Sequence, residues 1–389
     1  MTQPTSTSPA PDAPNVLTGV SISMDALTAA KELYDSIFQP DISLCLFYCS
    51  PEYDLAQLGS ELHRLFGDIN IIGCTTAGEI TPTGYLQGAL TGVSFASETF
   101  QVVTQRIDEI DNFAIADGVN ITHALSNSLV RLGAKPPSGE NTFAFLLIDG
   151  LCGREEVVVS SLHRGIGSIQ LFGGSAGDNE NLSETFLFHD GEFRSNCALL
   201  SLIQTDLPFT VFKTQHFVDS DTKMVITEAD PGKRIVTEIN GVPAGREYAR
   251  MVGLEVNKLT PMIFAAYPVV VKIGGEYFVR SLGKVNEDGS LLFFCAIDEG
   301  VVLTVAEGKD MVENLGDAFQ QVRACVGEPI LTLGCDCLFR RLEMEQKGLQ
   351  GDIAHIMMEN KVIGFSTYGE QYNAMHVNQT FTGVAIGRK

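Results

Sequence analysis

Short apolar runs alternate with amphipathic stretches along most of the chain. Residues 44–51 (LCLFYCSP) and 143–150 (FAFLLIDG) are apolar runs of the length expected for buried strands. Residues 55–66 and 155–166 follow them with helical periodicity, and a second apolar run comes after each helix. The pattern therefore predicts a strand–helix–strand unit that occurs twice in the first half of the chain.

A glycine- and hydroxyl-rich phrase closes each of these units. It is IIGCTTAGEI at residues 71–80 and QLFGGSAGD at residues 170–178, and it returns as VIGFSTYGEQ at residues 362–371. The helices before the first two phrases end in the same LHR triplet, which begins at Leu62 and Leu162. The third phrase has its own lead-in: a strand at 329–334, a helix around 338–350 and a strand at 353–365. Three copies with similar flanks predict internal duplication rather than chance use of common turn residues.

Tight hairpins are expected between the second and third units. Asp190-Gly191, Gly274-Gly275 and Asp288-Gly289 are dipeptides that supply the positive φ angles of two-residue turns. Antiparallel ribbons therefore join the strand–helix units. The predicted fold class is mixed α/β, with mixed β-sheets, helices packed on their faces and two domains.

The expected domain organisation follows from these elements. Residues 1–14 form a polar tail that we expect to be disordered. Residues 15–234 form the first domain, with one repeat at about 15–130, a second at 142–234 and a separating segment at 131–141. Residues 235–389 form the second domain, because a new strand, an Asn-Gly turn and a short helix begin near residue 235.

Composition limits the function classes. The 389 residues are 44% hydrophobic and 19% charged, as in a globular chain. We expect a cytoplasmic protein, because the first residues lack a secretory signal and nine cysteines are an odd number that suits reduced thiols. No apolar stretch is long enough to suggest a membrane span. The net charge of −22 repels phosphate backbones and anionic lipid, so nucleic acid and membrane surfaces are not expected partners.

The glycine-hydroxyl loops are the candidate binding site. Glycines after a strand expose backbone N–H groups, and open α/β sheets bind ligands at the carboxyl ends of their strands. The alternative is a purely structural role, in which the glycines only make turns and the hydroxyls cap the backbone. The candidate ligand-binding residues are Cys74, Thr75, Thr76, Gly174, Ser175, Ser366, Thr367 and Tyr368.

The chain resembles the FIST family. The phrases at 71–80 and 170–178 resemble the N-terminal FIST domain. The segments INGVPAGREYARMVG, YPVVVKIGGEYFVRSLGKVNEDGSLLFF, GCDCLFRRLE and GFSTYGEQYNAMHVNQTFTGVAIG resemble the C-terminal FIST domain. The resemblance covers most of the chain from about residue 15, and its closing segment is specific.

The resemblance implies a sensory protein. FIST proteins are regarded as bacterial sensory domains that bind a small molecule or gas and signal to a histidine kinase or a cyclic-dinucleotide enzyme. Some stand-alone members are haem proteins that sense nitric oxide, and this chain is FIST alone. A haem iron needs an axial ligand, for which His376 is the first candidate because it follows the third loop, and His216 is the second. The alternative to haem ligation is a structural role, in which His376 forms a hydrogen bond to that loop.

Several alternatives stay open. Instead of haem, the ligand could be a polar metabolite such as an amino acid, whose carboxylate would suit bare N–H groups, or the chain could be a structural adaptor. Ser175 in GGSAG fits a nucleophile elbow, but the loop and hairpin that follow it argue against a hydrolase. One Cys-x-Cys pair, Cys335 and Cys337, is a weak metal signal, so no metal beyond haem iron is expected. The oligomeric state is open, a homo-oligomer included.

Overall fold

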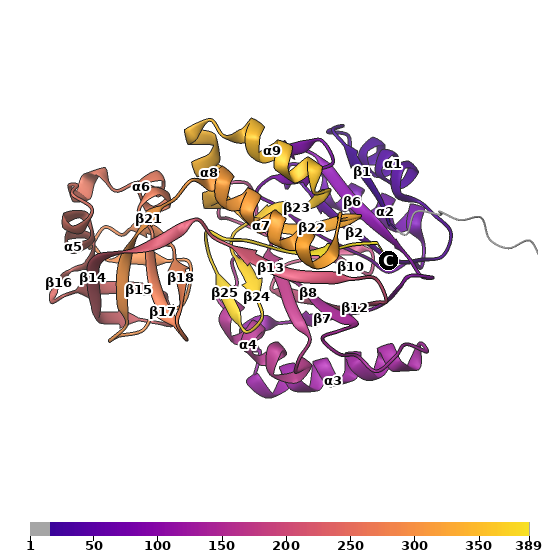
Figure 1. The fold of residues 1–389 in the computed structure, drawn as a ribbon, viewed down its shortest axis with the longest axis horizontal. Helices are drawn as coiled ribbons and strands as arrows, with labels where there is room; N and C mark the ends of the chain where they lie inside the picture. Colours follow the sequence, from indigo (N-terminus) through magenta and orange to yellow (C-terminus); the bar gives the residue numbers. More distant parts are fainter. Residues whose placement is uncertain (1–15, 389) are drawn as a thin grey trace, which may run out of the picture.

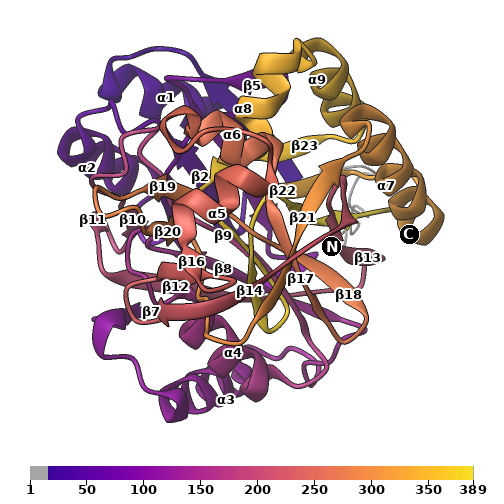
Figure 2. The ribbon, with the colours of Figure 1, turned by 90° about the vertical axis from the view of Figure 1, so that its left-hand side faces the viewer.

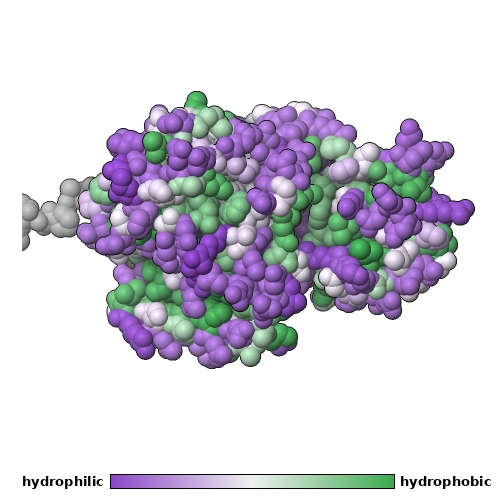
Figure 3. Space-filling model, turned by 180° about the vertical axis from the view of Figure 1, so that it is seen from behind, coloured by the Kyte–Doolittle hydropathy of each residue, from purple (hydrophilic) through white to green (hydrophobic). Residues whose placement is uncertain are grey.

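The computed structural model describes residues 16–388 and shows a body of α/β repeats with a smaller β-rich domain at one side (Figure 1). The predicted tail at residues 1–14 lies outside the described residues. Seen from behind, a waist separates the body from the smaller domain (Figure 3). The predicted fold class, mixed sheets with helices on their faces and repeated units, is confirmed.

The first repeat runs strand, helix, strand, helix, strand, hairpin, strand. Both of its helices begin at an aspartate, Asp25 or Asp54, whose carboxylate accepts a hydrogen bond from a backbone N–H of the first turn. Its elements are β1 (Val16–Ser21), α1 (Ala26–Ile37), β2 (Ile42–Cys49), α2 (Leu55–Phe66), β3 (Ile71–Thr75), the hairpin β4 (Glu79–Thr81) and β5 (Gly84–Leu86), and β6 (Leu90–Ala96).

The second repeat has the same order. The segment 131–141, expected to separate two repeats, instead lies inside the second one, between its first helix and its second strand. The elements are β7 (Phe100–Asp108), the short helix η1 (Ile110–Asn112), α3 (Ile115–Arg131), β8 (Thr142–Ile148), α4 (Glu155–Ile166), β9 (Gln170–Ser175), the hairpin β10 (Leu187–His189) and β11 (Glu192–Arg194), and β12 (Cys197–Thr205).

The third repeat is interrupted after its first strand. Residues 353–359 were expected to be part of a strand but form a helix, because Ile353 and Met357 are buried at the i, i+4 spacing of one helix face. The elements are β13 (Phe209–Thr214), α7 (Met311–Val326), β22 (Leu331–Cys337), α8 (Leu338–Lys347), α9 (Gln350–Glu359), β23 (Val362–Thr367), the hairpin β24 (Glu370–Tyr372) and β25 (Met375–Val377), and β26 (Phe381–Ile386).

The interruption is a separate β-rich domain, residues 217–308, which we call the inserted domain. Residue 235 begins β15, which pairs with β14, so one sheet runs across the expected domain boundary. The elements are β14 (Phe217–Asp230), β15 (Ile235–Ile239), β16 (Val242–Pro243), α5 (Ala244–Met251), η2 (Val256–Lys258), α6 (Pro261–Ala266), β17 (Val269–Ile273), β18 (Glu276–Arg280), β19 (Leu282–Val285), β20 (Leu291–Phe293) and β21 (Val302–Gly308).

The three repeats build three sheets with one strand order. The orders are β1-β6-β2-β3-β10-β11, β7-β12-β8-β9-β24-β25 and β13-β26-β22-β23-β4-β5. Each sheet ends in the hairpin of a different repeat: the first receives the hairpin of the second, the second that of the third, and the third that of the first. The repeats are therefore joined in a cycle, and internal duplication is confirmed.

The main core lies where the inner faces of the three sheets meet. Tyr48 of the first repeat stacks on Phe365 of the third, with ring centroids 4.6 Å apart. Separate apolar clusters pack the helices against the outer face of each sheet. Figure 2 shows these helices around the outside of the body.

One glycine recurs at the same place in each repeat: Gly73, Gly173 and Gly364. Each lies opposite a residue of the neighbouring parallel strand. A Cβ atom there would lie 2.6, 2.0 or 1.8 Å from the carbonyl oxygen of Phe47, Leu146 or Gly334, respectively. The repeated glycine is therefore required by close backbone approach.

All three predicted hairpins form, but the third is not a two-residue turn, because residues 286–290 join β19 to β20 and Asp288 has no positive φ. Asp190-Gly191 joins β10 to β11 with φ angles of 53° and 81°, and Gly274-Gly275 joins β17 to β18 with 62° and 95°. Gly289 has a φ of 82° in the turn between β19 and β20. In the described part of the chain, no helix is long and apolar enough to cross a membrane.

Candidate functional site

The three glycine-hydroxyl loops meet at the ends of β3, β9 and β23. The N–H of Ala77 donates to the carbonyl of Ser366 at 2.9 Å, and the N–H of Gly177 donates to that of Thr75 at 2.9 Å. The N–H of Tyr368 completes the cycle by donating to the carbonyl of Ser175 at 3.4 Å. Each loop thus supplies the hydrogen-bond acceptor for the next, so these N–H groups are not bare.

Most of the predicted loop residues are consequently inside the body. The Thr367 hydroxyl, a candidate ligand-binding group, is buried and donates to the Ser175 carbonyl oxygen at 2.6 Å. The Thr76 hydroxyl donates to Glu79 at 2.6 Å. A Cβ on Gly174 would meet the Phe365 ring at 2.6 Å. Six predicted residues are completely buried: Cys74, Thr75, Thr76, Ser175, Ser366 and Thr367.

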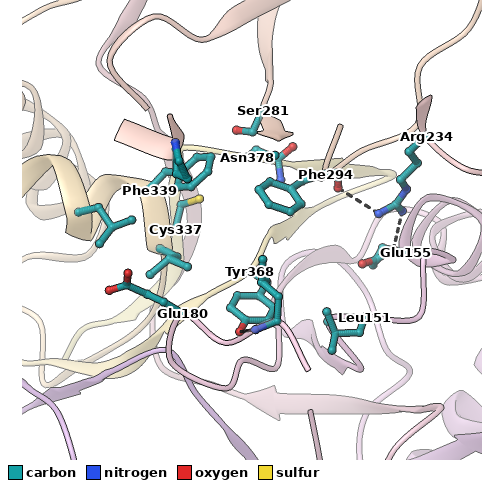
Figure 4. A pocket seen from close by; sticks show the side chains of 16 residues that line it. Leu151, Glu155, Glu180, Arg234, Ser281, Phe294, Cys337, Phe339, Tyr368 and Asn378 are labelled. Carbon is teal, nitrogen blue, oxygen red and sulfur yellow. Dashed lines mark hydrogen bonds and ion pairs between the residues drawn. The ribbon is translucent and has the colours of Figure 1, made fainter. Parts of the chain in front are cut away.

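Tyr368 is the predicted loop residue that lines a cavity. The cavity has a volume of about 140 Å³, room for several water molecules or one small organic molecule. It lies between the inserted domain and the carboxyl ends of β8, β9, β22 and β23, as expected for an α/β sheet. Figure 4 shows residues from both domains around it. They are Gly150, Leu151, Glu155, Glu180, Leu182, Arg234, Pro261, Ser281, Gly283, Phe294, Cys337, Leu338, Phe339, Leu342, Tyr368 and Asn378.

Aromatic rings form much of the wall. Phe294 of the inserted domain meets Phe339 of α8 edge to face, with ring centroids 5.6 Å apart. The Phe294 ring packs on Gly283, where a Cβ would lie 3.0 Å away, and the Tyr368 ring packs on Gly150 at 3.1 Å. The Tyr368 hydroxyl is held by Asp178, to which it donates. This part of the wall is therefore apolar and closely packed.

The charged side chains of the wall are paired. Arg234 of the inserted domain lies 2.6 Å from both Glu155 and Glu156 of α4. Burial alone would lower the pKa of Arg234, but the two carboxylates raise it above its usual value. Glu180 lies 3.2 Å from Arg341. No charged group of the described lining is therefore left for a charged ligand without breaking an existing pair.

Two neutral side chains of the wall have no hydrogen-bond partner within the described residues. They are Asn378, at both atoms of its amide, and Ser281, at its hydroxyl. Each is 1% exposed. Buried polar groups are nearly always hydrogen-bonded, because leaving one unpaired costs about 1–3 kcal/mol. Asn378 and Ser281 thus bring three polar atoms without a partner among the described residues to the wall of the cavity.

The family follows from two matches along the chain. Residues 43–242 match the FIST N domain, and residues 244–373 match the FIST C domain. The chain belongs to the FIST family. A FIST chain is consistent with a sensory role in which a small ligand is bound.

Individual relatives add little about function. An uncharacterized protein of Methanocaldococcus jannaschii is 24% identical over 357 residues, which cover 81% of this FIST chain and 67% of that protein. Two solved structures of cyanuric acid hydrolase, one of them from A. caulinodans, cover 96% of the FIST chain at 10% and 8% identity, with TM-scores of 0.37 and 0.36. Likeness at this level carries no argument about this chain.

His216 of this FIST protein is engaged at both ring nitrogens. Arg340 Nη1 lies 3.0 Å from His216 Nδ1, and because arginine can only donate, Nδ1 is the acceptor. The Nε2–H group then donates to Glu343 at 2.9 Å. Burial lowers the pKa of His216, which agrees with this neutral tautomer. Neither nitrogen is therefore free to bind iron in this arrangement.

His376 is a packed side chain beside the third loop. It is 3% exposed, and its ring lies so close to Gly369 that a Cβ there would be 2.3 Å from it. Its Nδ1 lies 3.3 Å from Gln371 Nε2, the residue opposite it in the β24–β25 hairpin. His376 therefore has a structural role: it packs on the third loop and lies within hydrogen-bond distance of Gln371 beside it.

The residues around the cavity do not fit a haem. No histidine or methionine, two of the usual axial ligands, is among the described residues that line the cavity. Burial raises the pKa of the Cys337 thiol well above its usual value, so it stays protonated. The other conceivable axial group, the Tyr368 hydroxyl, is already bonded to Asp178.

The structure also places the possible nucleophile, Ser175, and the Cys-x-Cys pair. Ser175 ends β9, is buried and accepts a hydrogen bond from Gln371 at 3.0 Å, and a loop rather than a helix follows it. This is not the exposed strand-to-helix elbow of a hydrolase. Cys335 and Cys337 are buried, and burial raises the pKa of both thiols. No group of three or more metal-ligating side chains occurs among residues 16–388.

Asn378, Ser281 and Arg234 were missed by the sequence reasoning. Asn378 comes two residues after His376, within the segment that most resembles FIST, but an asparagine in a loop gives no local signal. Ser281 and Arg234 belong to the inserted domain, and nothing in the sequence indicates that it covers the strand ends. Only the packing of the inserted domain on the body brings them to the cavity.

Proposed function

We propose that this FIST chain is a cytoplasmic sensor that binds a small, uncharged polar molecule between the inserted domain and the body. It has no catalysis of its own in this account. The observation that carries the proposal is the pair of buried, unpartnered side chains, Asn378 and Ser281, in an otherwise apolar or charge-paired wall. Unlike an amino acid, an uncharged ligand needs no free counter-ion there.

The position of the cavity supports a sensory role. Ser281 belongs to the inserted domain and Asn378 to the third repeat, so a molecule that bonds to both contacts two domains. Its affinity then depends on how the domains are arranged, and binding favours the arrangement that contacts it best. A separate partner, such as a histidine kinase or a cyclic-dinucleotide enzyme, would bind one arrangement of the domains in preference to the other.

The haem-based alternative is not the function we propose. It requires an iron ligand on the cavity wall, and His216 and His376 both lie elsewhere with other contacts. The polar-metabolite alternative requires only the groups that the wall already presents.

A thermal-shift screen tests the proposal. Uncharged, acidic and basic metabolites are added to the wild type and to Asn378→Leu, which keeps the size of the side chain and removes the amide. Because a ligand that binds only the native state raises the Tm, an uncharged binder should raise the Tm of the wild type and not that of Asn378→Leu.

Asn360→Leu is the matched control, because Asn360 is also 1% exposed but lies outside the cavity lining. It should keep the ligand-dependent shift. Shifts confined to charged compounds, or equal shifts in the wild type and Asn378→Leu, would contradict the proposal.

A further inference from the structure

The Asn378 amide offers an unusual recognition edge. Its Nδ2 is a donor and its Oδ1 an acceptor, side by side, and neither has a partner among the described residues. A group that carries an acceptor next to a donor can make two parallel hydrogen bonds with such an edge. Ring nitrogens and their neighbouring carbonyl or amino groups have this arrangement, and asparagine binds such an edge of adenine in this way.

The rest of the wall suits a flat molecule. Figure 4 shows Asn378 next to Ser281 and Phe294, with Tyr368 and Leu151 across the cavity. The Phe294 and Tyr368 rings pack closely against Gly283 and Gly150. Aromatic faces favour a planar ring over a flexible chain, because stacking needs a flat partner.

The charge of the wall and the size of the cavity further limit the class of ligand. Arg234 is paired with Glu155 and Glu156, and Glu180 with Arg341, so the unpaired groups are all neutral. A volume of about 140 Å³ admits a molecule with one or two small rings.

We propose that the cavity binds a planar, uncharged nitrogen heterocycle with a ring N–H beside a carbonyl, or a ring nitrogen beside an amino group. The proposal rests on the function proposed above and names its ligand class. The Asn378 amide pairs with this edge of the ring, Ser281 bonds to a further polar atom, and Phe294 and Tyr368 pack on the ring.

Calorimetric titration with matched probes tests the class. Uracil and adenine are the probes, 5,6-dihydrouracil keeps the amide edge in a puckered ring, and 1,3-dimethyluracil keeps the flat ring without N–H groups. We expect uracil or adenine to bind the wild type, and both uracil analogues to bind roughly tenfold to a hundredfold more weakly than uracil.

The protein variants separate the parts of the site. Asn378→Leu should weaken binding of the probe by roughly tenfold to a hundredfold, because it removes both hydrogen bonds. Phe294→Leu should weaken the planar probe but not 5,6-dihydrouracil, because it removes only a stacking face. Asn360→Leu should leave both affinities unchanged.

The outcomes distinguish this inference from the proposed function. If neither uracil nor adenine binds, or if 1,3-dimethyluracil binds as well as uracil, the heterocycle class is wrong. The proposed function stands in that case if another uncharged metabolite binds and needs Asn378. If no uncharged compound in the thermal-shift screen needs Asn378, both proposals are wrong.

Discussion

Arg234 and Glu155 join the inserted domain to the second repeat through an ion pair of 2.6 Å that is almost completely buried. The pair lines the same cavity as Asn378 and Ser281, and Glu156 strengthens it from the next position of α4. One of the contacts between the two domains thus forms part of the cavity wall.

Arg234→Met should strongly destabilise the contact between the domains. The change leaves Glu155, whose side chain is 2% exposed, without its cation, and losing one partner of a buried pair costs about 3–5 kcal/mol. Urea unfolding measures this loss. Lys233→Met is the control in the same domain, because Lys233 and Asp230 are 73% and 47% exposed in their pair and the change should cost little. Equal losses in the two variants would contradict the role given to Arg234.

Asn378→Leu should leave the ligand-free protein as stable as the wild type, or stabilise it. The substitution removes two buried groups that have no partner, and with them the cost of keeping them from water. Asn360→Leu should instead destabilise by about 2 kcal/mol or more, because Asn360 is equally buried but bonds to Arg323 and the Ile356 carbonyl. Thermal unfolding without added ligand compares them. A large loss in Asn378→Leu would show that its amide has a structural partner.

Gly364→Ala should cost about 3 kcal/mol or more. The new Cβ would lie 1.8 Å from the Gly334 carbonyl oxygen, so the two strands must separate. Gly316→Ala in α7 is the control: nothing lies within 4 Å of a Cβ there, and alanine favours a helix by about 1 kcal/mol. Chemical unfolding of both variants measures the difference, and a neutral Gly364→Ala would contradict the account of the repeated glycine.

Glu79 should make the stability depend on pH. Burial raises its pKa to about 7, against hydrogen bonds from Thr76 and Ala89 that lower it. An acid whose folded pKa is raised contributes stability that is fully present below its unfolded pKa of 4.5 and is lost as the pH rises through about 7. Glu79→Gln should therefore match the wild type near pH 4 and exceed it by a few kcal/mol above pH 8. Unfolding free energies across this range check it, and parallel curves for the two proteins would refute it.

Much of the fold follows from local patterns. The buried strands, the helices after them and the hairpin turns depend on neighbouring residues, and the glycine phrase recurs because each repeat has the same close contact between strands. The strand β13 and the helix α7 were not assigned to the third repeat, because the inserted domain separates them in sequence. The apolar residues of α9 were assigned to a strand because Ile353, Ile356 and Met357 fall within a short run that suits either period.

The candidate site was predictable only in part. The carboxyl ends of the strands were the right region, and Tyr368 lies on the cavity wall. The loop hydroxyls were assigned to a ligand because one copy, considered alone, contains no acceptors for its N–H groups. In the folded protein each loop accepts hydrogen bonds from the N–H groups of another loop, as the bond from the Ala77 N–H to the Ser366 carbonyl shows. The groups left unpartnered come from segments whose meeting depends on how two domains pack.

The most direct test of the central claim is mass spectrometry of small molecules released from the purified protein. The wild type and Asn378→Leu are purified without harsh washing, denatured, and compared with Asn360→Leu, which leaves the cavity lining unchanged. The account predicts an uncharged small molecule that is released by the wild type and Asn360→Leu and is depleted at least tenfold in Asn378→Leu. A retained molecule that is equally abundant in all three proteins would contradict the claim that this cavity binds its ligand through Asn378.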